Sequence, residues 1–163
     1  MKVFISWSGE RSKKIAEILR KWIKQVINVV EPFVSSQDID KGARWSADIA
    51  QELQDTNFGI LCVTKDNYKQ PWLLFEAGAL SKAVEIAHVV PVLFHLKPSD
   101  LQGSPLLQFQ QTTSFSEEEI KKLIVALNNA CGTAARDTHD LDDAFSILYP
   151  HLVRELDARA RRT

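Results

Sequence analysis

The sequence predicts an α/β domain in which a parallel sheet is covered by helices on both faces. The main observation is that short apolar runs, typical of buried strands, alternate with longer segments whose apolar positions recur at helical spacing. The second observation is size and composition. The chain has 163 residues, of which 45% are hydrophobic and 25% charged, which is the ordinary range for one globular domain.

The expected strands are short and rich in Val, Ile, Leu and Phe, as is typical of strands buried on both faces. Pro91 lies within one of them, where it removes a donor from the strand ladder. This predicts a position near the start of that strand or at the edge of the sheet. Five segments are expected to form the strands: 3–5, 32–34, 60–63, 89–94 and 112–115.

The first helix is predicted by apolar residues at i, i+3, i+4 and i+7 positions from Ile15 to Val26. Ser8 is its expected N-cap, and Glu10 stands in its first turn. A second helix is expected from Trp45 onward, before the third strand. A third begins at Pro71, a residue suited to the first helical position, and runs to about residue 87.

Two further helices are expected after the last strand. Ser116 and Glu119 have the spacing of a capping box, and Gly132 marks the end of the helix that they begin. A final helical pattern runs from Leu141 to Leu156. Pro150 stands in its middle, which predicts a kink or two short helices.

Composition excludes several classes of protein. Twenty basic and 21 acidic residues give a formal charge of −1, so we expect no direct binding of nucleic acid and no attraction to an anionic membrane. No apolar run is long enough to span a bilayer, and the N-terminal residues turn polar too soon for a signal peptide. Cys62 and Cys131 stand far apart without CxxC spacing, and the histidines have no ligand spacing. We therefore expect a cytoplasmic protein with reduced thiols and no metal site.

Ligands of doubly wound sheets bind at the carboxyl ends of the strands, which selects segments 6–8, 37–45 and 64–76. Within the last segment, Trp72 and Glu76 stand four positions apart and so share one face of the expected helix. The residues around Glu76 are almost all apolar or small. A carboxylate in such a stretch is costly unless it is paired or has a function.

Three segments together resemble the Toll/interleukin-1 receptor (TIR) domain family, specifically its bacterial enzymatic branch: 3–8 (VFISWS), 38–45 and 72–76 (WLLFE). The likeness covers about residues 1–132, leaving 133–163 as a helical extension or a linker to a further domain. It implies a flavodoxin-like, doubly wound sheet of five parallel strands with helices on both faces, and a mobile loop at 38–45.

The resemblance also implies an activity, namely cleavage of the nicotinamide–ribose bond of NAD⁺ to give nicotinamide and ADP-ribose or a cyclic isomer. The family's catalytic glutamate corresponds to Glu76, and Trp72 corresponds to a tryptophan that supports the site. In that family, activity commonly depends on head-to-tail self-association, which can form filaments. The implied setting is bacterial defence, antiviral defence included, or virulence, with a sensor domain or protein that triggers assembly and NAD⁺ loss.

The chemistry of the residues agrees with that assignment. Loss of nicotinamide builds positive charge on the ribose, and a carboxylate about 4 Å away stabilises it by roughly 4 kcal/mol, or about a thousandfold in rate. The leaving group departs as a neutral base, so no strong general acid is required. We expect no cofactor, with NAD⁺ as the substrate. Further candidates for substrate contact, through the pocket floor, an aromatic face, the loop or the pyrophosphate, are Phe4, Ser6, Trp7, Ser8, Asp38, Arg44 and Trp45.

Two other functions remain open from the sequence. A TIR domain can act as a non-catalytic scaffold that signals by assembly alone, although such a scaffold has no need of Glu76 on an apolar helix. The chain also resembles nucleoside deoxyribosyltransferases, whose glutamate likewise stands beside small residues, as in the segment 76–79. Their chemistry also takes place at an anomeric carbon, with a different substrate.

Overall fold

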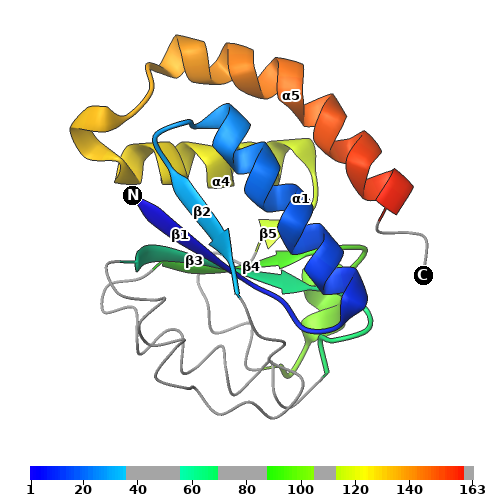
Figure 1. The fold of residues 1–163 in the computed structure, drawn as a ribbon. Coiled ribbons are helices and arrows are strands. Elements are labelled where there is room, and N and C mark those ends of the chain that lie inside the picture. The colour runs from blue at the N-terminus through cyan, green and yellow to red at the C-terminus, as the bar shows by residue number, and fades with distance from the viewer. Residues whose placement is uncertain (36–55, 70–87, 105–112, 160–163) are drawn as a thin grey trace.

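The computed structural model describes residues 1–35, 56–69, 88–104 and 113–159 (Figure 1). Their strands form one parallel sheet in the order β2-β1-β3-β4-β5, which is the flavodoxin-like order. Four strands have four to eight residues, and β5 adds two at one edge. The predicted α/β class with a parallel sheet is confirmed. The strands are β1 (Lys2–Ser6), β2 (Glu31–Val34), β3 (Thr56–Val63), β4 (His88–Leu93) and β5 (Thr113–Ser114).

Three long helices lie together on one side of the sheet in Figure 1: α1 (Glu10–Val26), α4 (Glu117–Ala130) and α5 (Thr138–Arg159). Short 3-10 turns, η2 (Pro98–Leu101) and η4 (Gly132–Ala134), join the later elements. The helices expected from Trp45 onward and from Pro71 to about residue 87 lie outside the described residues.

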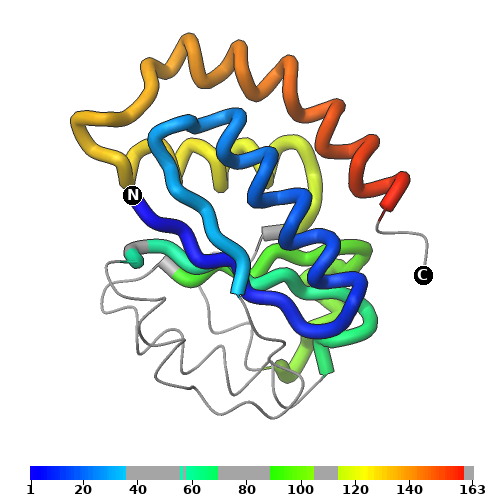
Figure 2. Tube along the Cα trace, viewed as in Figure 1, coloured from blue at the N-terminus to red at the C-terminus, as the bar shows by residue number. Residues whose placement is uncertain are grey.

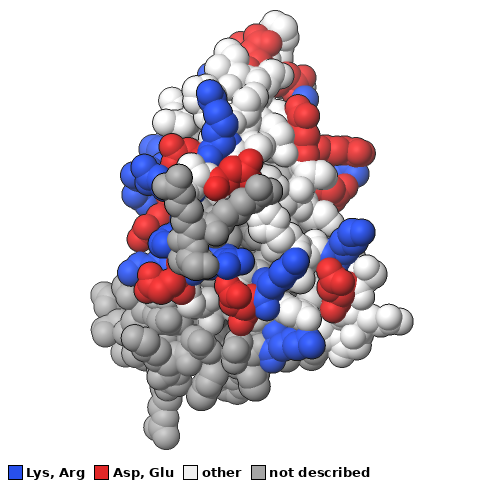
Figure 3. Space-filling model, turned by 90° about the vertical axis from the view of Figure 1, so that its right-hand side faces the viewer, with Lys and Arg blue, Asp and Glu red and all other residues white. Residues whose placement is uncertain are grey.

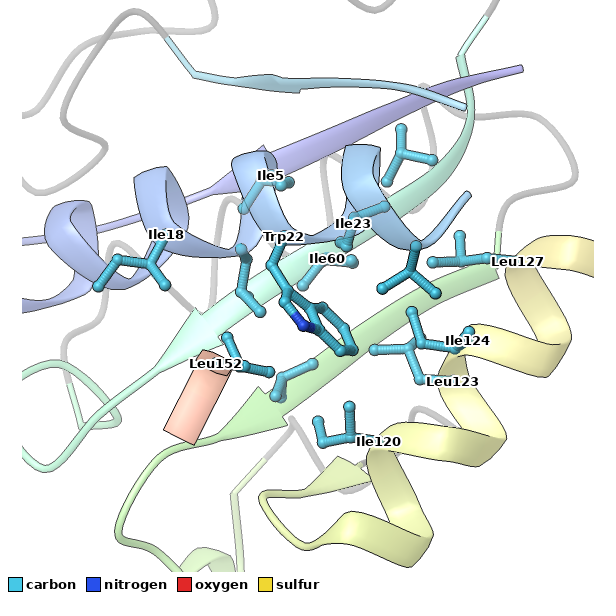
Figure 4. Close-up of a cluster of buried hydrophobic side chains, with 14 of the residues drawn as sticks. Ile5, Ile18, Trp22, Ile23, Ile60, Ile120, Leu123, Ile124, Leu127 and Leu152 are labelled. Carbon is cyan, nitrogen blue, oxygen red and sulfur yellow. The ribbon is translucent and has the colours of Figure 1, made fainter. Parts of the chain in front are cut away.

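The side chains between these helices and the sheet form one apolar cluster, which we call the apolar layer. Its central residue is Trp22 of α1, which points toward the strands and α4 in Figure 4. Alternate residues of β1 and β3, such as Ile5 and Ile60, meet it from the sheet. Burial of this apolar surface is the main force that holds the helices on the sheet. Labelled members in Figure 4 are Ile5, Ile18, Trp22, Ile23, Ile60, Ile120, Leu123, Ile124, Leu127 and Leu152.

Helix α1 has the predicted extent and apolar face, but its N-cap is Gly9 rather than Ser8. Gly9 has φ 86° and ψ 162°, a conformation open mainly to glycine, and its carbonyl accepts the first helical hydrogen bond from the Lys13 amide at 3.0 Å. The prediction of Ser8 as the cap was wrong because the glycine turns the chain one residue later. No side chain caps this helix.

Helix α4 begins as predicted. The Ser116 hydroxyl accepts a hydrogen bond from the Glu119 amide at 3.2 Å, and three glutamates stand in the first turn, where the helix dipole favours negative charge. The helix ends at Ala130, and Gly132 follows with φ 61°. The predicted stop near Gly132 is confirmed.

Helix α5 is continuous from Thr138 to Arg159 with Pro150 inside it, so of the two alternatives, a kink or two short helices, the second was wrong. It runs back along α1 (Figure 2), and the Trp22 indole donates to the Leu148 carbonyl at 2.9 Å, close to the proline. Packing on α1 therefore supports the helix where the proline removes a donor. Four residues of the predicted pattern are buried: Leu141, Phe145, Leu152 and Leu156.

Pro91 lies inside β4 rather than at its start, opposite Leu61 of β3. The Phe94 amide donates to the Val63 carbonyl of β3. Backbone groups of successive strand residues point alternately to the two neighbouring strands, so the backbone nitrogen of Pro91 points toward β5. The missing donor therefore faces the β5 side of the strand, and the described residues of β5 pair with Val92 and Leu93 rather than with Pro91.

Charge is mixed on the surface. Figure 3 shows Lys and Arg interspersed with Asp and Glu over the described part of one side of the molecule, in keeping with the formal charge of −1. In the part of the chain that the structure describes, no helix combines the length and the apolar character needed to cross a bilayer.

Candidate active site

Buried polar side chains gather where β1 and β3 end. Strand β2 lies on one side of β1 and strand β4 lies beyond β3, so the chain order reverses between β1 and β3, at the topological switch point. Ligands bind at this point in open α/β sheets. We call the group the polar junction; its members, each 4% exposed or less, are Ser6, Ser8, Ser12, Ser35, Thr64 and Asn67.

Asn67 connects the two strand ends. Its Nδ2 donates to the Ser8 carbonyl at 3.0 Å and to the Cys62 carbonyl at 3.1 Å, while its Oδ1 accepts from the Thr64 amide at 2.8 Å. The turn is closed from the other side as well, because the amides of Asn67 and Tyr68 both donate to the Thr64 carbonyl. One buried amide thus fixes the turn after β3 and ties it to the segment after β1.

Helix α1 is fixed to the same place by Ser12. The Ser12 hydroxyl donates to the Cys62 carbonyl at 2.9 Å and accepts from the Ser8 amide at 3.1 Å. On the surface beside it, Arg11 of α1 pairs with Asp66 of the turn after β3 at 3.1 Å. The N-terminus of α1 is therefore held over the ends of β1 and β3.

Two hydroxyls of the polar junction make no hydrogen bond within the described structure. Ser8 Oγ and Thr64 Oγ1 are buried and find no hydrogen-bond partner within the described structure. An unsatisfied buried polar group costs about 1–3 kcal/mol, and such groups are uncommon in folded proteins. Thr56 Oγ1 at the start of β3 is also buried without a partner in the described structure, but Ser8 and Thr64 stand where ligands of open α/β sheets bind.

Trp7 is packed rather than open. Its indole donates to the Ser35 carbonyl at 2.8 Å, the side chain is 6% exposed, and Lys13 Nζ lies 5.3 Å from the ring centroid. The ring therefore already has a cation beside it. The indole fixes the end of β2 to the end of β1, and the Ser35 amide donates to Ile5 at 2.9 Å.

Phe4 and Ser6 alternate with Ile5 and so face the side of the sheet away from the apolar layer. Phe4 is 1% exposed and packs against Phe33 of β2, with 5.2 Å between ring centroids. Ser6 is the last residue of β1, opposite Leu61. Phe4 is thus a core residue here, and Ser6 stands at the edge where a ligand would bind.

The remaining predicted site residues lie outside the described residues: Asp38, Arg44, Trp45, Trp72 and Glu76. Their assignment rests on the sequence. The structure does describe the turn at 64–69, which comes shortly before Trp72 and Glu76 in the chain.

Cys62 is not a nucleophile in this site. It lies in β3 within the apolar layer, and burial raises the pKa of its thiol far above the ordinary range, so the group stays protonated. Within 1–35, 56–69, 88–104 and 113–159, no group of three His, Cys, Asp or Glu side chains could hold a metal ion.

Sequence reasoning did not name four members of the junction as candidates: Ser12, Ser35, Thr64 and Asn67. The segment that begins at Thr64 was selected for its place after a strand, but nothing in the pattern singled out Asn67 as the residue that reaches back to Ser8. A polar residue at a buried helical position, as Ser12 is on the apolar face of α1, was the one available signal.

The described residues therefore form a parallel α/β domain with flavodoxin-like strand order and a polar site at its switch point. The family model of the TIR domain matches residues 3–124, so the chain belongs to the TIR domain family. The resemblance seen in the sequence is confirmed.

Among solved structures, the chain is similar to the TIR domains of the activated Roq1 resistosome, a complex described as directly recognizing the pathogen effector XopQ. The two share 16% identity over 97% of this chain and 98% of that chain, with a TM-score of 0.50. At this identity the likeness supports the fold alone. A comparison with curated proteins found no match.

Proposed function

We propose that this TIR domain is an NAD⁺ glycohydrolase, with Glu76 as the catalytic carboxylate. The observation that carries the proposal is the WLLFE segment at 72–76 in a chain that belongs to the TIR family, which includes NAD⁺-cleaving members. The polar junction supports it, because buried hydroxyls without partners stand at the strand ends where a nucleotide would bind.

In the proposed reaction the bond between the nicotinamide nitrogen and ribose C1′ breaks, and its electron pair leaves with nicotinamide as a neutral base. Positive charge develops on the ribose, and the carboxylate of Glu76 stabilises it. Water then attacks C1′ and gives ADP-ribose, with release of a proton. A hydroxyl or ring nitrogen of the same molecule attacking instead gives a cyclic isomer.

The proposal includes self-association as the activating step. The TIR domains to which the chain is similar belong to an assembled resistosome, which favours TIR–TIR contacts as the source of activation. A heterologous contact between identical chains extends into filaments unless it closes into a ring. NAD⁺ is an intracellular metabolite, so a cytoplasmic protein of defence or virulence, triggered by a sensor, fits this activity.

The test is nicotinamide release from NAD⁺ by protein held on beads or fused to an oligomerising tag, with the products separated by chromatography. We expect turnover by the wild type and a loss of about a thousandfold in Glu76→Gln, since the charge that stabilises the ribose is removed. Glu118→Gln on the exposed surface of α4 is the matched control and should keep full activity.

Equal turnover by the wild type and Glu76→Gln would exclude Glu76 as the catalytic group. An inactive clustered wild type would favour the scaffold function, which binding between copies of the chain would then support. Base exchange on deoxynucleosides without NAD⁺ turnover would instead favour the deoxyribosyltransferase-like alternative.

A further inference from the structure

We propose that Asn67 is a positioning residue of the active site: it fixes the turn after β3, from which the chain continues to Glu76, against the segment after β1. This inference rests on the proposed function and adds a residue that the sequence did not indicate. It is carried by the three hydrogen bonds of one side chain that is 2% exposed.

The asparagine amide matches its surroundings at each atom. Two backbone carbonyls, from Ser8 and Cys62, face its NH₂ group, and one backbone N–H, from Thr64, faces its oxygen. The reverse orientation of the amide would place donor against donor and acceptor against two acceptors. An aspartate has the same shape and keeps the acceptor for Thr64, but it sets a carboxylate oxygen against the two carbonyls.

The contact between Asn67 and Ser8 spans 59 positions in the sequence and joins the two strand ends of the switch point. On its two sides are the unpartnered hydroxyls of Ser8 and Thr64, and both residues are held through their backbones by the same amide. Loss of the amide would therefore free the turn after β3 from the Ser8 carbonyl and leave the Thr64 amide without its acceptor. Ser12 would still join the Ser8 amide to the Cys62 carbonyl, and β1 and β3 would remain paired through Ser6 and Leu61.

Asn128 provides a matched control. It is 4% exposed and also bonds to the backbone through both ends of its amide: its Nδ2 donates to the Arg136 carbonyl and its Oδ1 accepts from the Arg136 amide, both at 2.8 Å. These bonds join the end of α4 to the segment before α5, away from the polar junction. The two asparagines thus have similar burial and both use the donor and the acceptor of the amide on backbone atoms, but only Asn67 joins two strand ends.

The experiment compares Asn67→Ala with Asn128→Ala in clustered protein, at a temperature where circular dichroism shows both to be folded. We expect both to lower the melting temperature. Only Asn67→Ala should lower kcat for nicotinamide release, by about 10- to 100-fold, because misplacement of a catalytic group by about 1 Å can have that effect. Asn67→Asp should lower kcat as well, and it serves as the second variant if Asn67→Ala does not fold.

Equal kcat for Asn67→Ala and the wild type, or an equal loss of kcat in Asn67→Ala and Asn128→Ala, would reduce Asn67 to a residue of stability alone and overturn the inference. An active Asn67→Asp would do the same, since the bonds to Ser8 and Cys62 are lost in it. A clustered wild type that releases no nicotinamide overturns the proposed function, and this inference with it; an active wild type leaves the comparison of variants decisive.

Discussion

Two regions meet at β1 and β3, and they are built from opposite kinds of side chain. In the apolar layer, α1, α4 and α5 bury Leu, Ile, Val and aromatic side chains against the sheet, and the Trp22 indole donates to the Leu148 carbonyl. In the polar junction, buried side chains are serine, threonine and asparagine, and two hydroxyls have no partner among the described residues.

The two regions contribute differently to the free energy of folding. Apolar burial is favourable wherever shapes fit, so the layer stabilises the fold without requiring a ligand. Buried polar groups gain little net free energy even when they are hydrogen-bonded, and they cost free energy when they are not. Polar groups concentrated at the switch point therefore indicate a site.

Phe145→Ala should cause the largest loss of stability, about 3–5 kcal/mol in the free energy of unfolding, because it leaves a cavity in the apolar layer. Phe145 is buried and packs against Trp22 and Tyr149, with ring centroids 6.0 and 5.3 Å away. Urea denaturation followed by tryptophan fluorescence measures the change. Ile147→Ala on the same helix, where the side chain is 65% exposed, should change it by less than about 0.5 kcal/mol.

Ser12→Ala should lower the free energy of unfolding by about 1–3 kcal/mol, since it leaves the Ser8 amide and the Cys62 carbonyl without the Ser12 hydroxyl. We expect kcat for nicotinamide release to stay at the wild-type value, because the Asn67 bonds remain. Urea denaturation and turnover are measured on the same preparation. A loss of stability below about 0.5 kcal/mol would show that this hydroxyl does little to hold α1 on the strand ends.

The Cys62 thiol should make stability fall at alkaline pH. Burial raises its pKa in the folded state, so above the ordinary thiol pKa of about 8.5 the unfolded chain releases a proton that the folded chain keeps. Stability from this group is therefore fully present below that pH and is lost as pH rises. Between pH 8 and pH 9.5 the wild type should lose about 1 kcal/mol more than Cys62→Ala; parallel pH profiles would contradict the assignment.

Ser8→Ala should have the smallest effect on stability, between no change and a gain of about 1 kcal/mol, because the hydroxyl that it removes is buried without a partner. The contrast with Ser12→Ala, another buried serine of the junction, makes the measurement informative. If the hydroxyl binds substrate, KM for NAD⁺ rises while stability does not fall. A clear loss of stability would mean that Ser8 Oγ has a structural partner.

Local pattern was sufficient for most of the described fold. The apolar runs located β1, β3 and β4, the helical spacing located α1 and α5, and Ser116 with Glu119 located the start of α4. Each depends on residues close together in sequence, whose period or spacing sets the local structure. Two local predictions were wrong, the N-cap at Ser8 and two short helices at Pro150. Gly9, at positive φ, is the N-cap of α1, and packing on α1 supports α5 as one helix.

The candidate site divides in the same way. The sequence alone identified the TIR family and selected the strand ends, with Phe4, Ser6, Trp7 and Ser8 on the first of them. Only the tertiary structure showed that Trp7 is packed against Ser35 and that Asn67 reaches Ser8. A motif is visible in the order of residues, whereas a bond between side chain and distant backbone depends on which strands the sheet brings together. That is why the sequence determined the family of this protein, whereas the fold decided which of the described buried groups are paired and which have no partner.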